Sequence, residues 1–246
     1  MNKCLKPSRA TPGQRAFFWI GDSHAGMLYA AMEEAVKGKM AFVWTARGMC
    51  SYYSDEQLGV CNQDSYESAQ VYRNLITDAL RAELKAGDVV GLTAVNNEHV
   101  KEPALRWYDS FLLPLLREKG AQLVLIGDIP QMQQDPRACV WQPESCIREW
   151  GQHRGGYDEA KDFGSAGYLL VEEEPVEEFV AKPENSDVHM LSIAHLMCDV
   201  DKTTCGPTIP GTTIAAYNDK DHLMRVASMY LSPFFCAAFE SWGFYS

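Results

Sequence analysis

The sequence predicts an α/β domain, a three-layer α/β/α sandwich built on a mainly parallel sheet of five strands. Two observations support this fold class. Short apolar runs alternate along the chain with segments whose apolar residues recur every three or four positions, which is typical of a parallel sheet with helices on both faces. The 246 residues are 46% hydrophobic, enough for one substantial core, and no internal repeat or low-complexity tract divides them.

The first half of the chain supplies three strands and two helices. Residues 16–20 are a wholly apolar run that stops at a turn, which predicts a strand, and 24–36 have an apolar face at helical spacing. The apolar run 41–45 predicts the second strand. Residues 65–85 are amphipathic and predict a long helix, after which a Gly-Asp turn leads into the third strand, 89–95.

The second half of the chain continues the alternation less regularly. Residues 103–119 have helical spacing and end at a glycine, and 122–127 predict the fourth strand. Residues 128–156 are predicted to be a long excursion from the sheet. A helix is expected over 172–182, and the apolar run 188–196 predicts the fifth strand, although helical spacing also fits it.

The two ends of the chain differ in character. Residues 1–15 contain prolines and a glycine and are predicted to be an N-terminal linker, so that the folded domain covers 16–246. That domain is expected to end in a long helix over 221–242. No secretory signal peptide is visible at the start, so we expect any targeting element to lie upstream of this chain.

Polar residues follow several of the predicted strands. The carboxyl ends of parallel strands meet at one edge of a sheet, where ligands bind in this fold class. We therefore expect these residues to converge at that edge: Ser23, Gly48, Asn96, Asn97 and Asp128.

Charge and hydropathy exclude several classes of partner. The formal net charge is −11, which argues against binding to nucleic acid or to an anionic membrane surface. No apolar run reaches the roughly 18 residues that a membrane span requires. Neutral sugars, esters and small metabolites remain open as substrates.

Eight cysteines bear on the compartment. No pair has the Cys-x-x-Cys spacing of a zinc or redox motif, the count is even, and three consecutive pairs are close in sequence. This pattern predicts disulfides and hence an extracytoplasmic location, and buried free thiols in a reducing compartment are the alternative. The predicted bridges are Cys50–Cys61, Cys139–Cys146, Cys198–Cys205 and, to tie the linker to the last helix, Cys4–Cys236.

Two short motifs carry the candidate chemistry. Gly21-Asp22-Ser23 joins the first predicted strand to the first helix, and Asp219 precedes His222 by three residues near the C-terminus. A hydroxyl, an imidazole and a carboxylate are the groups that make a serine nucleophilic. The alternative interpretation of Ser23 is that it merely caps the helix, which is a common role of serine at that position.

These motifs resemble the first and last blocks of the SGNH (GDSL-type) hydrolase superfamily. The similarity is sharpest to SGNH domains fused to or partnered with membrane acyltransferase-3 proteins. Those domains also begin Gly-Asp-Ser-His, tend to carry a Pro…Cys segment after the fourth strand, and often have a Cys…Cys loop before Tyr-x-Asp-x-x-His-Leu. The matching segments here are 21–24, Pro130…Cys139, Cys198…Cys205 and 217–223. The resemblance spans residues 16 to 235 and implies a flavodoxin-like fold.

The resemblance implies a catalytic triad. Ser23 matches the nucleophile, His222 the general base and Asp219 the carboxylate that orients the base. Asp221 is a competing carboxylate, but its side chain is expected to point away from that of its neighbour His222. A carboxylate-paired histidine predicts activity that rises with pH through one limb at about pH 6–7.5.

The resemblance implies the oxyanion hole less directly. Three donors are expected, namely the N–H of Ser23, Gly48 after the second strand and Asn96 after the third. Gly48 could equally be a turn glycine, and Asn97 competes with Asn96 because the family's glycine two positions earlier is missing. His24, beside the nucleophile, is expected to line the substrate pocket.

The function predicted from these residues is that of a serine esterase or O-acyltransferase. We expect it to act on short acyl esters, such as acetyl esters, of a carbohydrate through an acyl-enzyme, without cofactor or metal. The resemblance implies a membrane acyltransferase-3 domain as partner and favours transfer, and we expect a monomer. The alternative is a non-catalytic glycan-binding domain, for which exposed tryptophans and tyrosines would offer sugar-stacking faces.

Overall fold

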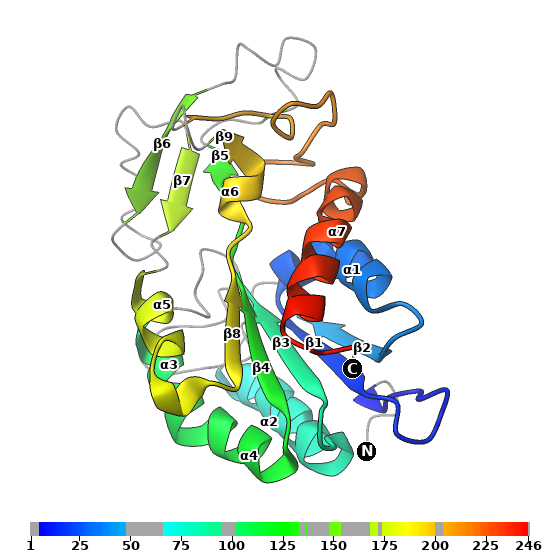
Figure 1. Cartoon of the computed structure of the whole chain (residues 1–246). Helices are drawn as coiled ribbons and strands as arrows, with labels where there is room; N and C mark the ends of the chain where they lie inside the picture. The colour runs from blue at the N-terminus through cyan, green and yellow to red at the C-terminus, as the bar shows by residue number, and fades with distance from the viewer. Residues whose placement is uncertain are drawn as a thin grey trace.

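The computed structural model confirms the predicted α/β/α fold (Figure 1). It describes residues 5–47, 66–94, 102–132, 136, 148–153, 168–171, 174–199 and 204–245. All strands of the central sheet run parallel, in the order β2-β1-β3-β4-β8. They are β1 (Ala16–Gly21), β2 (Ala41–Ala46), β3 (Val89–Thr93), β4 (Gln122–Ile126) and β8 (Val188–Leu191).

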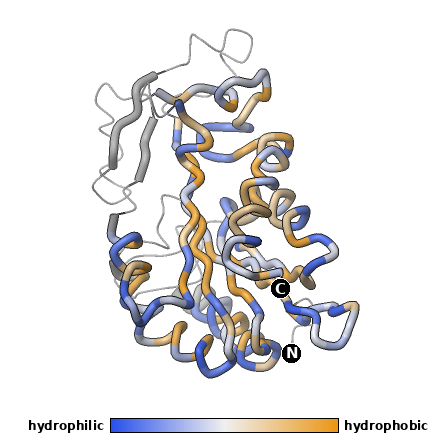
Figure 2. Tube along the Cα trace, in the orientation of Figure 1, coloured by the Kyte–Doolittle hydropathy of each residue, from blue (hydrophilic) through white to orange (hydrophobic). Residues whose placement is uncertain are grey.

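Helices cover both faces of this sheet (Figure 1). The helices α1 (Ser23–Val36) and α7 (Arg225–Ser241) pack together on one face. The other face is covered by α2 (Tyr66–Glu83), α3 (Glu102–Trp107), α4 (Leu113–Lys119) and α5 (Glu174–Val180). The central strands are continuously hydrophobic, as Figure 2 shows, because a parallel sheet is buried on both faces.

Strand β1 shows how the sequence divides the core into two halves. Phe17 and Trp19 pack into the cluster that contains the buried side chains of α1 and α7. Phe18 and Ile20 point to the opposite face and join the cluster under α2 and α4. Successive side chains of a strand alternate between faces, so one apolar run supplies both cores.

The predicted helix over 103–119 is interrupted by a π-helical turn. The chain passes from α3 through η3 (Tyr108–Leu112) into α4, whose first turn contains Pro114. Proline has no N–H to donate four residues back, so a wider turn before it is the physical consequence. The helix ends as predicted at Gly120, which has φ 66°.

Two predicted boundaries are wrong. The expected strand 188–196 ends at Leu191, and the short helix α6 (Ala194–Met197) follows it. The expected last helix over 221–242 begins only at Arg225. Residues before Arg225 instead close a turn, in which Tyr217 bridges to Leu223. Helical spacing in the sequence continued through this turn, but its backbone hydrogen bonds are not helical.

A second sheet lies beyond the carboxyl ends of the central strands (Figure 1). Its order is β5-β7-β6-β10-β9, and each strand is short. The strands are β5 (Gln131–Met132), β6 (Arg148–His153), β7 (Tyr168–Val171), β9 (Cys198–Asp199) and β10 (Thr204–Cys205). The sequence predicted only an excursion over part of this region, and three of the five strands have only two residues, which leave no periodic signal.

The cysteine predictions have three outcomes. The disulfide Cys198–Cys205 is present and joins the paired residues of β9 and β10. Cys236 is a free thiol whose Sγ lies 3.6 Å from the carbonyl oxygen of Ala35, so the expected bridge to Cys4 is wrong. The expected pairs Cys50–Cys61 and Cys139–Cys146 lie outside the described residues.

Part of the segment expected to be a linker packs on the domain. Leu5 is buried in the core beside α2, and Arg9 forms an ion pair of 2.6 Å with the buried carboxylate of Asp88. The domain boundary at residue 16 stays a prediction. Within the described ranges, no helix combines the length and the apolar character needed to cross a membrane.

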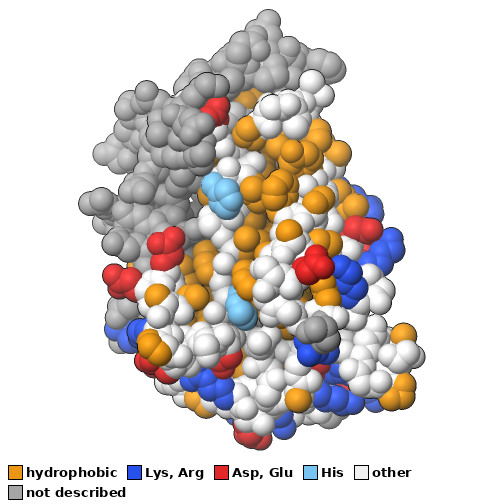
Figure 3. All heavy atoms as spheres, in the orientation of Figure 1, with side chains coloured by type: hydrophobic (Ala, Val, Ile, Leu, Met, Phe, Trp, Pro, Cys, Tyr) orange, Lys and Arg blue, Asp and Glu red, His pale blue; other side chains and the backbone are white. Residues whose placement is uncertain are grey.

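The N-terminal half of α7 is apolar on its outer face as well as its core face. Exposed hydrophobic side chains gather there, as Figure 3 shows. On or just before α7, they are Met224, Val226, Met229 and Phe234.

Gly21 is required where β1 enters the site. A Cβ atom there would overlap the carbonyl oxygen of Thr93 and lie 2.7 Å from Ala25 Cβ. We expect Gly21→Ala to lower the free energy of unfolding by about 1–3 kcal/mol, measured by urea denaturation. Gly26→Ala is the matched control, since a Cβ there meets nothing within 4 Å. Equal stability of the two variants would contradict this account.

Candidate active site

The candidate site lies where the chain reverses direction across the sheet. Strand β1 lies between β2 and β3 in the sheet. The connection from β1 to β2 therefore runs toward one edge, and the connection from β2 to β3 runs back toward the other. Ligands bind at such a point in this fold class. Ser23 lies two residues after the end of β1, and Asp128 lies two residues after the end of β4. The structure brings these two strand ends together through His24. Gly48, Asn96 and Asn97 lie outside the described residues, so their convergence stays a prediction.

Asp22, and not Ser23, caps helix α1. The Asp22 side chain accepts the N–H of His24 at 2.8 Å, and its backbone is extended as an N-cap requires. Ser23 is the first residue of the helix, and its hydroxyl contacts the imidazole of His222. The capping interpretation of Ser23 is therefore wrong.

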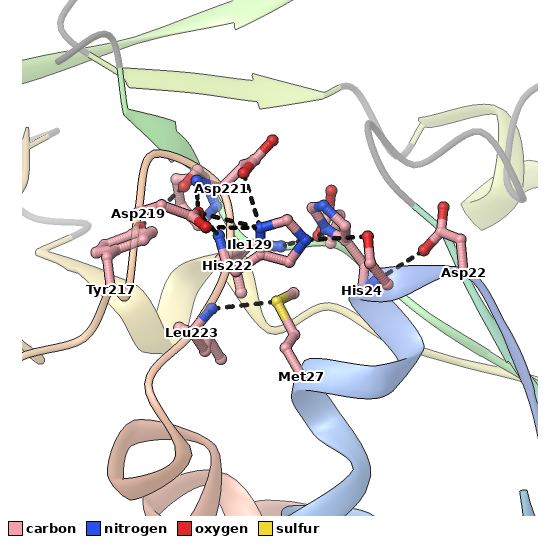
Figure 4. A network of polar contacts seen from close by, with 12 residues as sticks. Asp22, His24, Met27, Ile129, Tyr217, Asp219, Asp221, His222 and Leu223 are labelled. Carbon is pink, nitrogen blue, oxygen red and sulfur yellow. Dashed lines mark hydrogen bonds and ion pairs between the residues drawn. The ribbon is translucent and has the colours of Figure 1, made fainter. Parts of the chain in front are cut away.

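A tight turn presents His222 to Ser23. Figure 4 shows His222 on this turn together with Asp219 and Asp221. The carboxylate of Asp219 accepts the backbone N–H of Asp221 at 3.1 Å and that of His222 at 2.8 Å. The N–H of Asn218 donates to the carbonyl oxygen of His222 at 2.8 Å. Because His222 follows Asp219 by three residues, the Asp219 carboxylate can bind both the backbone N–H groups of the turn and the imidazole of His222.

The side chains form one continuous chain of contacts. His222 Nε2 lies 2.9 Å from Ser23 Oγ. On the other side of the ring, His222 Nδ1 lies 3.0 and 3.1 Å from the two carboxylate oxygens of Asp219. Ser23 and His222 are only partly buried, so the hydroxyl can meet a substrate. The sequence prediction that these three residues lie together is matched by the geometry, and their catalytic roles stay a proposal.

Asp221 also contacts the imidazole of His222. Its Oδ1 lies 3.0 Å from His222 Nδ1, so the expectation that it points away is wrong. The reason is the turn, because the bonds from Asp219 to two successive N–H groups bend the backbone and bring neighbouring side chains together. The expectation assumed that the side chains of neighbouring residues point in opposite directions. That alternation holds only for extended backbone.

Two carboxylates act on the protonation of His222. They raise the pKa of its imidazole to about 9. The hydrogen bond that the imidazole donates to Asp221 is the largest cause, partial burial opposes it, and Asp219 adds to it. In return, the hydrogen bond with His222 is the main cause that lowers the pKa of Asp221 to about 2. A raised pKa makes His222 a stronger base that is neutral over a narrower range of pH.

The pH dependence of activity follows from this shift. Only neutral His222 can accept a proton, so activity should rise with pH as the imidazole loses its proton. We expect the limb of kcat/KM well above pH 6.5, toward about 9, and not at the pH expected from one carboxylate. Asp221→Asn should move the limb down. A limb at or below pH 6.5 in the wild-type protein would contradict the role of the second carboxylate.

His24 lies behind this chain of contacts. It is 1% exposed, and its Nδ1 lies 2.6 Å from Asp128 Oδ1. Its ring centroid lies 4.9 Å from that of His222, at an interplanar angle of 51°. The sequence pointed to His24 as a pocket residue and to Asp128 as a polar strand end, but no motif linked the two. Contact of His24 with substrate stays a prediction.

One group of described residues offers several metal-ligating atoms. Ligand atoms of His24, Asp221 and His222 lie within 4.8 Å of one another. His222 uses both of its ring nitrogens, toward Ser23 and toward the aspartates, and His24 uses Nδ1 toward Asp128. A metal ion would have to displace the contact between His222 and Ser23 or that between His222 and the aspartates.

Comparison with known proteins identifies the family. The family model described as the SGNH domain (fused to AT3 domains) matches residues 2–236. The chain belongs to this family. The resemblance found in the sequence motifs is thereby confirmed, and it extends over nearly the whole chain.

Solved structures agree with the fold of this SGNH domain. Ten chains match, among them the periplasmic domain of the lipopolysaccharide acetyltransferase of Salmonella ser. Paratyphi A. That domain superposes with a TM-score of 0.59 and 16% identity, covering 97% of this chain and 85% of its own. At this identity the likeness shows the fold alone. No curated protein matches the sequence significantly.

The Cys198–Cys205 disulfide braces the segment that leads to the site. From Cys205 the chain folds back on itself, with Ala216 N donating to Pro207 O at 2.8 Å, and then enters the turn that carries His222. Reduction should lower ester turnover about 10–100-fold before helix content falls, because small displacements of catalytic groups are costly. The measurement is turnover against far-UV circular dichroism during thiol titration.

A matched control for this reduction is available in the chain. Cys236→Ser removes a free thiol on α7 and should leave turnover unchanged. Peptide mapping verifies that the Cys198–Cys205 bond is reduced. If turnover then falls only as the helix content falls, the bracing role is contradicted.

Proposed function

We propose that this SGNH domain is a serine O-acyltransferase or esterase that handles short acyl groups, such as acetyl, on a carbohydrate. Ser23 is the nucleophile, His222 the general base, and Asp219, together with Asp221, orients the base. The observation that carries the proposal is the contact of 2.9 Å between His222 Nε2 and Ser23 Oγ, with a carboxylate at the opposite nitrogen. Family membership supports acyl-ester chemistry in general.

The first half-reaction forms an acyl-enzyme. His222 Nε2 takes the proton of the Ser23 hydroxyl as Oγ bonds to the ester carbonyl carbon, which gives a tetrahedral oxyanion. Asp219 and Asp221 stabilise the imidazolium formed at that moment. The oxyanion then collapses, the ester C–O bond breaks, and the imidazolium returns its proton to the departing alcohol.

The second half-reaction decides between hydrolysis and transfer. An acceptor hydroxyl gives its proton to His222 and attacks the acyl carbon, and Ser23 leaves with a proton from the imidazolium. Water as acceptor makes the protein an esterase, and a sugar hydroxyl makes it an O-acyltransferase. The chemistry of Ser23 is the same in both cases.

The oxyanion needs hydrogen-bond donors. Ser23 opens α1, so its N–H belongs to the helix N-terminus, where N–H groups have no acceptor within the helix. Gly48 and Asn96 remain the proposed second and third donors. Loss of one such donor costs about 10²–10³-fold in turnover in well-studied serine hydrolases.

The proposed partners follow from the family and from the one described disulfide. The family consists of SGNH domains fused to AT3 domains, which supports a membrane acyltransferase as the partner that delivers acyl groups. A periplasmic domain of an acetyltransferase shares the fold, and the Cys198–Cys205 bond is stable in an oxidising compartment. Both support an extracytoplasmic location, and the structural neighbour also supports an acylated carbohydrate as substrate.

Turnover of p-nitrophenyl acetate tests the proposal. The purified chain should release p-nitrophenol, and an added saccharide acceptor should divert acetyl groups from acetate to the sugar if transfer is the activity. Acetate and acetylated saccharide are measured together by chromatography. The absence of any burst or steady-state release would contradict the proposal and favour the non-catalytic glycan-binding alternative.

A further inference from the structure

A second imidazole–carboxylate pair lies directly behind the first. The side chains of His24 and Asp128 are 1% and 2% exposed, and 2.6 Å separates the nitrogen from the oxygen. The Asp128 carboxylate also accepts the N–H of Ile129 at 2.8 Å, which fixes its orientation. No step of the acyl transfer proposed above involves His24 or Asp128.

The pair favours a protonated imidazole in the interior. Burial is the largest influence on His24 and lowers its pKa, but the charge and hydrogen bond of Asp128 and the charge of Asp22 together outweigh it. The net result is a raised pKa, so His24 holds its proton more firmly than an ordinary histidine. A buried carboxylate such as Asp128 is costly without such a counter-charge.

That charge faces the base. The ring centroids of His24 and His222 are 4.9 Å apart, and the charge of protonated His222 lowers the pKa of His24. Like charges at this separation repel each other mutually, so a protonated His24 in turn opposes protonation of His222. We propose that the His24–Asp128 pair positions and tunes His222: its ring packs beside the base, and its charge offsets part of the pull of the two aspartates. This role rests on the proposed function of Ser23 and His222.

The charged groups around His24 fix the sign of the effect. In the described part of the chain, Asp22 faces it from the turn before α1, Asp128 from the end of β4, and Asp221 and His222 from the turn before α7. Loss of positive charge at His24 must favour protonated His222. Loss of negative charge at Asp221 must disfavour it.

Three variants turn these signs into a test. We expect His24→Gln to move the limb of kcat/KM for p-nitrophenyl acetate upward by about one pH unit, and Asp128→Asn to move it the same way by less. Asp128→Asn should shift the limb less, because it removes two charges that act on His222 in opposite directions. One is the negative charge of the carboxylate, and the other is the positive charge that the carboxylate stabilises on His24. Asp221→Asn should move the limb in the opposite direction. In the first two variants kcat should fall at neutral pH while KM changes little.

His189→Gln is the matched control. His189 lies on β8, is about half buried, and has its ring stacked on that of Trp242 at a centroid distance of 4.8 Å. Its substitution should leave the limb in place. If His24→Gln and Asp128→Asn lower kcat without moving the limb, the pair is merely structural and the proposal is overturned.

A measurement on the wild-type protein covers the case in which the variants fail to fold. Nitrogen-detected NMR of the imidazoles should show both nitrogens of His24 protonated throughout the pH range of the limb, and a neutral His24 ring in that range would overturn the proposal. Wild-type turnover that persists in Ser23→Ala would instead reject the proposed function. If turnover depends on Ser23 but the pH limb does not move in His24→Gln and Asp128→Asn, only the role of the His24–Asp128 pair is rejected.

Discussion

Ser23→Ala is expected to abolish ester turnover, with a loss of about 10⁴-fold or more and no change in the free energy of unfolding. The hydroxyl is partly exposed and contacts His222 Nε2, and the cap of α1 is supplied by Asp22, so its removal takes away chemistry and not packing. Steady-state release of p-nitrophenol and urea denaturation measure the two quantities on the same preparation.

A serine elsewhere on the surface provides the control for this substitution. Ser110 lies in η3, and its hydroxyl makes only a long bond of 3.4 Å to Trp107 O. Ser110→Ala should keep wild-type turnover. His222→Ala should fall as far as Ser23→Ala, because the residues act as a unit. Wild-type turnover in Ser23→Ala would remove the proposed nucleophile.

The second large effect is expected from the two carboxylates together. Asp219 and Asp221 both lie 3.0 Å from His222 Nδ1, so either can hold the imidazole once the other is lost. We expect Asp219→Asn or Asp221→Asn alone to cost about 10-fold in kcat, and the double variant to cost about 10³–10⁴-fold. Asparagine keeps an acceptor for the turn N–H groups, so circular dichroism should stay unchanged.

The pattern of these losses is the informative result. Shared orientation predicts that the double loss exceeds the product of the single losses. If Asp219→Asn alone were as damaging as the double variant, Asp219 would be the sole partner of His222. If the two losses simply multiplied, the carboxylates would act independently and the shared role would be wrong.

The sequence predicts those parts of the fold that have a regular hydrophobic pattern or a recognisable family motif. Strand β1 and helix α1 follow from an apolar run and a Gly-Asp-Ser turn, and the approach of His222 to Ser23 follows from a family motif, although 199 residues separate them. The order of the central strands agrees with the flavodoxin-like arrangement that the resemblance implied.

The parts that the sequence missed depend on local turns and on tertiary contacts. The direction of Asp221 is set by two backbone bonds to Asp219, and residue spacing does not report them. The His24–Asp128 pair joins residues 104 positions apart with no motif between them. The second sheet is made of strands such as β9, which has two residues and no periodicity to detect.

The central claim is that Ser23 carries the acyl group during turnover, and peptide mass spectrometry tests it most directly. The protein is mixed with p-nitrophenyl acetate, quenched in acid during the pre-steady state and digested. The account predicts one acetyl group on Ser23 that forms with the burst of p-nitrophenol, decays with turnover and is absent from Ser23→Ala. Acetyl on another residue, or none at Ser23 while the protein turns over the ester, would contradict it.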